Sequence, residues 1–341
     1  MKTRIAIIGT GMAGLACADH LSSQFDISIF DKSRGLSGRL STRRARAAGG
    51  EGVQPHASAH GFDHGAQYFS ATHSAFVDWL SPFEASGHVR RWQPLMVDIG
   101  KAGVTPRPPT EKLVFAPTMN TIGKALLAGR PTWRLYLDTP IDQISGTPGA
   151  WRLNADATED DAFGPFDLIV AAVPAPQAVA LLPQTDVTAR LQDVEMLGCH
   201  TLMLGYTAQQ EVTADWQCAH FDDDVLGFAA FNHNKPGRGN DTALVVQTRH
   251  AWSQAHIEDD IDAVAQEMKR RFGELTGLSV AAEAYDRVHR WRYASTAQPL
   301  GDAFLLDAAQ GIAAIGDWCL GSKVQDAFLS GYRLAARLNA Q

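Results

Sequence analysis

Glycines and one acid near the N-terminus have the spacing of a dinucleotide-binding turn. The first glycine permits a tight turn, the second lets the backbone approach a pyrophosphate, and the third lets a following helix pack closely. Free N–H groups at the start of that helix would bind phosphate. Asp31 lies about 20 residues further on, where a carboxylate can bind ribose hydroxyls. The expected contacts of the turn are Gly9, Gly11, Met12, Ala13 and Gly14.

The elements around this turn make the motif specific. Residues 4–8 form an apolar run typical of a buried strand, residues 15–23 have helical spacing, and residues 27–30 predict a second strand. Basic residues before an apolar run also resemble a signal peptide. The glycines favour a buried strand and its helix instead, so we expect a Rossmann-like α/β unit.

A basic, glycine-containing segment follows the acid directly. Gly38 permits close backbone approach, and Arg39 offers a fork of donors to phosphate oxygens. The segment resembles the extended FAD signature of the amine oxidase and glutathione reductase-like superfamily, although Ser37-Gly38 stands where that signature has two glycines. The alternative is a solvated basic loop. The predicted contacts are Lys32, Arg34, Gly38, Arg39 and Leu40.

Three further segments fit the same superfamily. The segment 63–69 contains a Gly-Ala pair that in the family lies beside the flavin, though alone it would be an ordinary turn. Residues 134–144 and 150–155 resemble a small antiparallel meander, followed by an apolar strand over 166–173. After a strand at 311–315, Asp317 is expected on the ribityl chain; the alternative is a helix cap. The resemblance adds as FAD contacts His64, Gly65, Ala66, Gln67, Tyr68, Ile141, Val173, Pro174, Trp291, Gly316, Asp317, Val324 and Ala327.

The combination of short motifs resembles the bacterial renalase-like proteins over nearly the whole chain. The matching runs are Asp31 to Gly35, Gly65 to Phe69, Pro174 to Ala178, His289 to Trp291, and Gly316 to Cys319. The resemblance implies an FAD-dependent oxidase of 2- or 6-dihydro isomers of NAD(P)H. Hydride would pass to flavin N5, and dioxygen would then be reduced to hydrogen peroxide.

Two features depart from that family. Residues 45–60, rich in Ala, Gly and His, look like an inserted surface loop. Gln247 stands near a position where family members often carry histidine, which argues against a general base there. Hydride transfer needs none, because the donor ring becomes aromatic without losing a proton.

We expect two domains, with the FAD-binding part discontinuous. It comprises residues 1–75, 110–182 and 285–341, and the substrate domain comprises 76–109 and 183–284. Strand-like composition at 201–206, 227–231 and 243–248 and helical spacing over 259–275 predict an α+β substrate domain built on an antiparallel sheet. The candidate substrate or catalytic residues, each with core packing or a surface role as the alternative, are Gln67, Tyr68, Asn232, Gln247, His289, Trp291, Arg292 and Tyr293.

Three rival functions remain open at this level. A flavin amine oxidase would need an active-site lysine, for which Lys235, in a predicted turn, is the nearest candidate. A desaturase or porphyrinogen oxidase acts on bulky apolar substrates, and no amphipathic membrane anchor is evident. A non-catalytic FAD-binding redox protein is the third. Covalent flavin attachment at Cys319 is the alternative to the non-covalent FAD that we expect.

The amino-acid composition argues against several other classes of protein. The 341 residues carry a formal net charge of -7, which argues against nucleic-acid binding. The four cysteines are scattered, so neither a disulfide framework nor a metal site is expected, and isolated thiols suit the cytoplasm. No long apolar run predicts a membrane span. We expect a monomer or weak dimer whose partners are a small dinucleotide and molecular oxygen.

Overall fold

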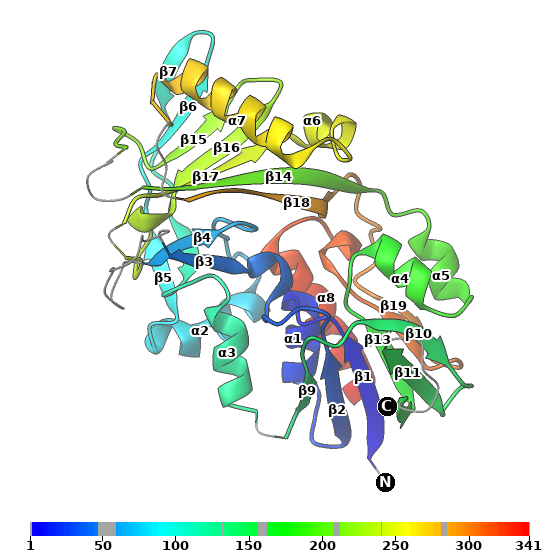
Figure 1. Ribbon diagram of the computed structural model, residues 1–341. Helices are drawn as coiled ribbons and strands as arrows, with labels where there is room; N and C mark the ends of the chain where they lie inside the picture. Colours follow the sequence, from blue (N-terminus) through cyan, green and yellow to red (C-terminus); the bar gives the residue numbers. More distant parts are fainter. Residues whose placement is uncertain are drawn as a thin grey trace, which may run out of the picture.

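The structure is a computed structural model that describes residues 2–46, 59–130, 132–155, 162–206, 212–239, 241–280 and 285–340. It has two layers, with a parallel sheet and its helices below and a large, mainly antiparallel sheet above (Figure 1). This arrangement confirms the predicted fold class. None of the described helices is long and apolar enough to cross a membrane.

The lower layer is built on a six-stranded sheet. Neighbouring strands run parallel except for the edge pair β19–β20. Strand β1 lies at the centre, and its last four residues are buried on both faces, as the continuous apolar run predicts. In spatial order the strands are β19 (Leu305–Asp307), β20 (Ile312–Ala314), β13 (Leu168–Ala171), β1 (Thr3–Ile8), β2 (Phe25–Phe30) and β9 (Arg134–Tyr136).

Different elements cover the two faces of this sheet. One face packs against helices α1 (Met12–His20), α2 (Ser74–Ala85), α3 (Thr121–Ala128) and α8 (Val324–Asn339). The other face packs against α4 (Ala175–Leu181), α5 (Asp186–Leu191) and a small antiparallel sheet. That small sheet comprises β10 (Ile141–Ser145), β11 (Trp151–Ala155) and β12 (Phe163–Phe166).

The predicted meander is only partly correct. Residues 134–136 do not belong to the small antiparallel sheet, because β9 pairs in parallel with β2 and extends the large sheet. The predicted strand over 166–173 is also divided. Asp167 separates β12 from β13, and its carboxylate accepts hydrogen bonds from the Arg4 backbone and side chain.

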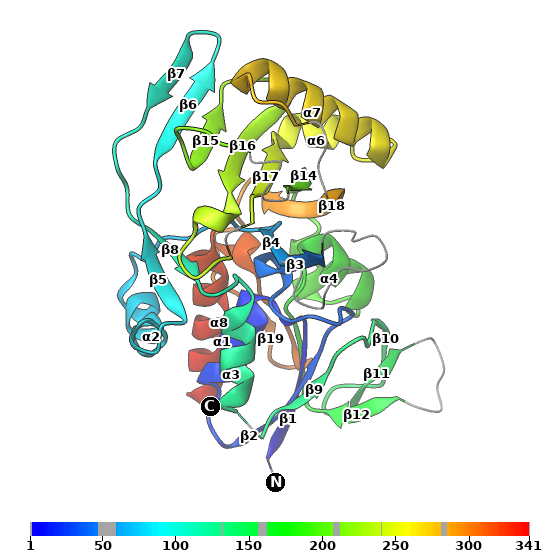
Figure 2. The same cartoon turned by 60° about the vertical axis from the view of Figure 1, so that its left-hand side comes forward.

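The upper layer is a seven-stranded sheet. Its outer face packs against α6 (His250–Ala255) and α7 (Ile261–Thr276), and its inner face looks toward the lower layer (Figures 1 and 2). All neighbours are antiparallel except β15 and β6. The spatial order is β18 (Tyr285–Thr296), β14 (Met196–Gly205), β17 (Ala243–Thr248), β16 (Leu226–Phe231), β15 (Cys218–Phe221), β6 (Met96–Gly100) and β7 (Gly103–Pro106).

Strand β18 belongs to the upper sheet, although we grouped residues 285–296 with the FAD-binding part. It pairs with β14 from Tyr285 to Thr296, so the chain returns to the lower layer only after this strand. Two antiparallel pairs of strands complete the fold. Strand β3 (Thr42–Arg46) pairs with β4 (Ala59–Asp63), and β5 (Val89–Trp92) pairs with β8 (Lys112–Phe115). Residues 47–58 of the predicted loop lie outside the described residues.

A buried histidine on the outer face predicts a pH-dependent stability. His200 is fully buried on β14 against Trp252, and within the described chain neither ring nitrogen has a hydrogen-bond partner. Burial lowers the pKa of His200 from 6.5 to about 4, helped by Arg290 and His256. Between these pH values His200 is protonated in the unfolded chain but stays neutral in the folded chain. The free energy of unfolding therefore falls as pH falls from about 6.5 toward about 4.

Replacing His200 with phenylalanine should reduce this loss. The free energy of unfolding is measured by denaturation at about pH 7.5 and about pH 5. The loss of stability between the two pH values should be smaller in the variant than in the parent chain by up to about 2 kcal/mol. An unchanged difference would contradict the assignment.

Candidate functional site

The glycine turn between β1 and α1 has the geometry that its sequence predicts. Gly9 has a φ of 112°, and a Cβ on Gly14 would lie 2.1 Å from the Gly9 carbonyl oxygen. Both positions therefore require glycine. A Cβ on Gly11 would meet no described atom within 4 Å, and no side chain caps the first turn of α1. The helix start thus faces open space, as an anion-binding turn requires.

The acid and the basic segment lie beside this turn. Asp31, just after β2, accepts hydrogen bonds from the backbone N–H groups of Thr10 and Ser33, both at 2.8 Å. Lys32 and Arg34 are exposed, as in the solvated-loop alternative. The backbone N–H of Thr139 donates to the Asp31 carbonyl at 2.9 Å, so the chain approaching Ile141 reaches the same place.

Arg39 joins two of the predicted cofactor segments. Its guanidinium makes a two-pronged ion pair with Asp317 and donates to the Ala294 carbonyl at 3.0 Å. Asp317 is 4% exposed. The third cofactor segment meets them, because a Cβ on Gly65 would lie 1.9 Å from the Arg39 carbonyl oxygen. Gly65 is therefore required by the approach of two protein backbones.

The upper sheet holds the segment after β4 from above. Gln247 Nε2 donates to the Gly65 carbonyl at 3.0 Å, and Trp291 Nε1 donates to the His64 carbonyl at 2.8 Å. The Tyr68 ring lies edge-on to Phe228 of β16 at 5.9 Å. The structure thus brings the predicted residues of β17 and β18 onto the predicted flavin-contacting segment.

Two neutral histidines accompany Trp291. The His64 ring stacks on Trp291 at 5.3 Å, and the His289 ring lies edge-on to Trp291 at 4.2 Å. Burial, reinforced by nearby charges that include Arg43, lowers the pKa of both imidazoles to about 4. Both rings are therefore uncharged at neutral pH.

A cavity of about 660 Å³ opens on the inner face of the upper sheet. It is large enough for much of a small-molecule ligand. Gln247 and Phe228, which contact residues 65 and 68, form part of its wall. The remaining walls are mixed in charge and comprise Asp98, Cys199, His220, Phe221, Asp222, Gly227, Thr248, Arg249, His250 and Ala251.

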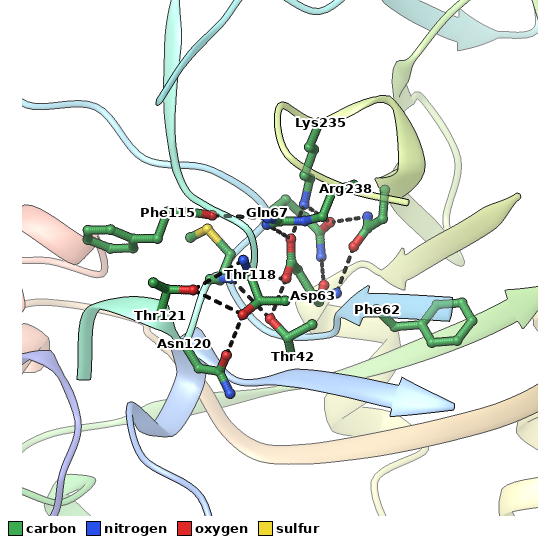
Figure 3. A network of polar contacts seen from close by, with 12 residues as sticks. Thr42, Phe62, Asp63, Gln67, Phe115, Thr118, Asn120, Thr121, Lys235 and Arg238 are labelled. Carbon is green, nitrogen blue, oxygen red and sulfur yellow. Dashed lines mark hydrogen bonds and ion pairs between the residues drawn. The ribbon is translucent and has the colours of Figure 1, made fainter. Parts of the chain in front are cut away.

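A buried ion cluster lies at the end of β4 (Figure 3). The fully buried Asp63 carboxylate pairs with Lys235 Nζ at 2.9 Å and with Arg238 Nη2 at 2.7 Å. Burial alone would raise the pKa of Asp63, but the charges of the two cations and hydrogen bonds from Thr42 and Lys235 lower it to about 2. The carboxylate is therefore ionised at neutral pH.

Two predicted catalytic residues take part in this cluster. Gln67 accepts from Asn232 at 3.0 Å and from Lys235 at 3.1 Å, while its amide nitrogen donates to the Asp63 and Gly65 carbonyls. Asn232 also accepts from the Asp63 backbone N–H at 2.7 Å. Both side chains are buried, at 6% and 0% exposure. They therefore hold the segment in place from behind and do not line the cavity.

The other predicted residues lie further away. Arg292 projects from the opposite side of β18 to Trp291 and pairs with Glu258 at the surface. Tyr293 and Ile141 pack against the core between the parallel sheet and α4. The Val173 carbonyl accepts from Trp318 Nε1 at 3.2 Å, directly before Pro174 and α4. Val324 and Ala327 lie in the first turn of α8.

Cys319 is a packed thiol. It is fully buried, and burial raises its pKa to about 12. A protonated, inaccessible thiol is a poor nucleophile, which argues against the alternative of covalent attachment at Cys319.

The ion cluster was missed by sequence reasoning. Asp63 opens the Gly-Ala motif, but nothing in its surroundings indicates that it is buried. Lys235 lies in the predicted turn after η3 (Asn232–Asn234), yet its side chain is fully buried. An acidic residue before the Gly-Ala pair and two cations three residues apart were the available signals. Only the tertiary fold brings them together.

The comparisons with known proteins agree with this architecture. Residues 7–81 match the NAD(P)-binding Rossmann-like domain, which includes the glycine turn and Asp31. Several solved structures resemble the whole chain. A protein of Exiguobacterium sp. 255-15, named provisionally as a protoporphyrinogen oxidase, has a TM-score of 0.78 at 14% identity, covering 100% of this chain and 99% of its own.

Two of the others are enzymes with different reactions. Cyclohexylamine oxidase from Brevibacterium oxydans IH-35A has a TM-score of 0.70 at 12% identity, with 100% and 99% of the two chains covered. Reduced UDP-galactopyranose mutase has a TM-score of 0.74 at 10% identity, with 100% and 94% covered. The chain therefore has the fold of these enzymes, and because that fold carries different reactions, the reaction must be argued from the site.

Proposed function

We propose that the protein is a flavoenzyme that binds FAD non-covalently along the glycine turn, Arg39 and Asp317. The open space before Gly11 supports this proposal, because it leaves the start of α1 free for a pyrophosphate. Asp31 lies just after β2, where it would bind ribose hydroxyls. The backbone of Arg39, whose side chain pairs with Asp317, lies next to residue 65. The residues present fit the cofactor.

We further propose that the substrates are dihydro isomers of NAD(P)H and dioxygen. This proposal rests on the cavity of about 660 Å³, because its wall residues Gln247 and Phe228 contact residues 65 and 68. When bound there, FAD would supply a hydride acceptor and a two-electron donor to dioxygen, so that with one proton from solvent the products are NAD(P)⁺ and hydrogen peroxide.

Two aromatic faces near the Gly65–Tyr68 segment argue against an amine substrate. Lys112 Nζ lies 5.1 Å from the centre of the Tyr68 ring, and Lys235 Nζ lies 5.8 Å from that of Trp92. These aromatic faces, which could otherwise receive an alkylammonium ion, already carry the protein's own cations. A cationic amine would therefore be repelled at these two faces.

The side chains at the site have positioning tasks. Gln247 and Trp291 fix the carbonyls of residues 65 and 64, and the wall residue Phe228 contributes an apolar face that excludes water. No base is needed, because a dihydronicotinamide ring becomes aromatic by losing hydride alone. The low pKa values of His64 and His289 agree with this, since both rings stay neutral at neutral pH.

Anaerobic mixing of the FAD-loaded protein with 6-dihydro-NAD tests the proposal. We expect rapid bleaching of the flavin absorbance, and release of hydrogen peroxide when air is admitted. Ordinary β-NADH, cyclohexylamine and a porphyrinogen serve as comparison donors in the same buffer. Bleaching by an amine or porphyrinogen alone would transfer the protein to those oxidases, and bleaching by no donor would leave only an FAD-binding protein.

Cofactor binding itself has a separate test at Gly11. Replacing Gly11 with alanine places a methyl group in open space, so the melting temperature of the cofactor-free chain should stay within about 2 °C. The affinity for FAD should fall at least about tenfold, because the methyl group occupies the space proposed for the pyrophosphate. Fluorescence titration with FAD measures this, and unchanged affinity would contradict the proposed position.

A further inference from the structure

The buried ion cluster carries more positive than negative groups. Lys235 and the Arg238 side chain are 0% and 4% exposed, and Asp63 is 0% exposed. Within the described residues, Asp63 is the only carboxylate at ion-pair distance from either cation. Two cations therefore share one carboxylate in a place where water does not screen them.

Lys235 is the member whose charge decides the balance. Arginine keeps its proton in proteins, and Asp63 is held ionised. Burial lowers the pKa of Lys235 and Arg238 lowers it further, whereas Asp63 opposes this change. A buried ion pair of Asp63 and Arg238 would be neutral without Lys235, so the lysine supplies the excess charge.

The excess charge lies against the segment that we propose to contact the flavin. Lys235 Nζ donates to Gln67 at 3.1 Å (Figure 3). Gln67 in turn donates to the Gly65 carbonyl at 3.3 Å. The charge of Lys235 also reaches the inner face of the upper sheet, where Nζ lies over the Trp92 ring and opposes the rise in the pKa of Cys218 that burial causes. Reduction adds negative charge to a flavin, and a nearby fixed cation favours the reduced form.

We propose that Lys235 is a positioning residue that sets the reduction potential of the bound flavin, by placing an uncompensated positive charge behind the Gly65–Tyr68 segment. The inference rests on the proposed FAD site but not on the proposed substrate. It requires no contact between Lys235 and the reacting atoms.

The test is the reduction potential of the FAD-loaded full chain, measured by equilibration with a reference dye. Lys235→Met removes the charge and leaves the neutral Asp63–Arg238 pair, while Asn232 still donates to Gln67. We expect the equilibrium for two-electron reduction to fall at least tenfold, which is about 30 mV for such a couple. Lys235→Arg, which keeps the charge, should restore most of this loss.

Lys269→Met is the matched control. Lys269 also pairs with an aspartate, Asp286, but on the side of the upper sheet where α7 packs. Its replacement should change the reduction equilibrium less than threefold. Lys235→Gln, which keeps a hydrogen-bond donor without the charge, replaces the methionine variant if that variant does not fold.

The outcomes separate this inference from the proposed function. Equal potentials in the parent chain and the uncharged Lys235 variants would overturn it, as would an equal shift in Lys269→Met. These measurements use no nicotinamide, so a failure of the substrate proposal leaves the result valid. Failure of the chain to bind FAD would overturn both the proposed function and the inference about Lys235.

Discussion

Replacing Gly331 with alanine should lower the free energy of unfolding by at least about 2 kcal/mol. Gly331 lies in α8 where it crosses α1, and a Cβ there would be 2.1 Å from the Ala13 carbonyl oxygen and 2.8 Å from the Cys17 nitrogen. Alanine gains about 1 kcal/mol of helix propensity over glycine. The overlap with backbone atoms outweighs this gain, because backbone cannot move aside as a flexible side chain can. Urea denaturation of the cofactor-free chain measures the difference.

Gly273 in α7 offers a control with the opposite sign. A Cβ on Gly273 would meet its nearest atom, the Leu278 carbonyl oxygen, at an ordinary 3.5 Å. Alanine there should stabilise the protein by about 0.5 to 1 kcal/mol through helix propensity. If both alanine variants were equally stable, the close crossing of α1 and α8 would be disproved.

The second large effect is expected for Asp63→Asn, at about 3 to 5 kcal/mol of lost stability. The substitution keeps the shape of the side chain but leaves two buried cations without a counter-charge. The effect should depend on pH in a defined direction. Because the pKa of Asp63 falls from 3.8 to about 2 on folding, its contribution is complete above about pH 4 and is lost as pH falls through about 2.

Asp167→Asn is the comparison for that experiment. Asp167 also pairs with an arginine, Arg4, but both side chains are about a third exposed. Solvent screens such a pair, so the cost should stay below about 1 kcal/mol. Thermal or urea unfolding of the two variants measures the loss in free energy of unfolding for each. Similar losses would contradict the assignment of Asp63 to a buried ion cluster.

The sequence predicted the lower layer well because its signals are local. The glycine turn, the strands on either side and the helix α8 each depend on residues within one short segment, and their spacing alone defines them. The separation of β9 from the small antiparallel sheet was not predictable in this way. Residues 134–136 are strand-like in either sheet, and only the edge left open by β2 decides which partner they take.

The site shows the same division between local and distant information. Gly9, Gly14 and Asp31 could be assigned from spacing, whereas Gln67 and Asn232 had to be judged by residue type. Polar side chains at a predicted active site suggested substrate contacts. Their hydrogen bonds instead turn inward to Asp63 and Lys235, which lie 172 residues apart in the chain. No periodicity in the sequence records such a pairing.

The cluster at Asp63 also constrains how the chain reaches its native state. The counter-ion Arg238 follows Asp63 by 175 residues, so during synthesis the carboxylate emerges from the ribosome long before either cation exists. The nucleotide-binding segment that precedes it therefore cannot assume its final packing on its own. Pairings of such sequence separation slow folding, and a truncated chain ending at residue 182 should fail to bury this region. The Rossmann-like segment can thus be recognised from its own sequence. Its packing around Asp63 is nevertheless complete only when the turn that carries Lys235 and Arg238 has folded.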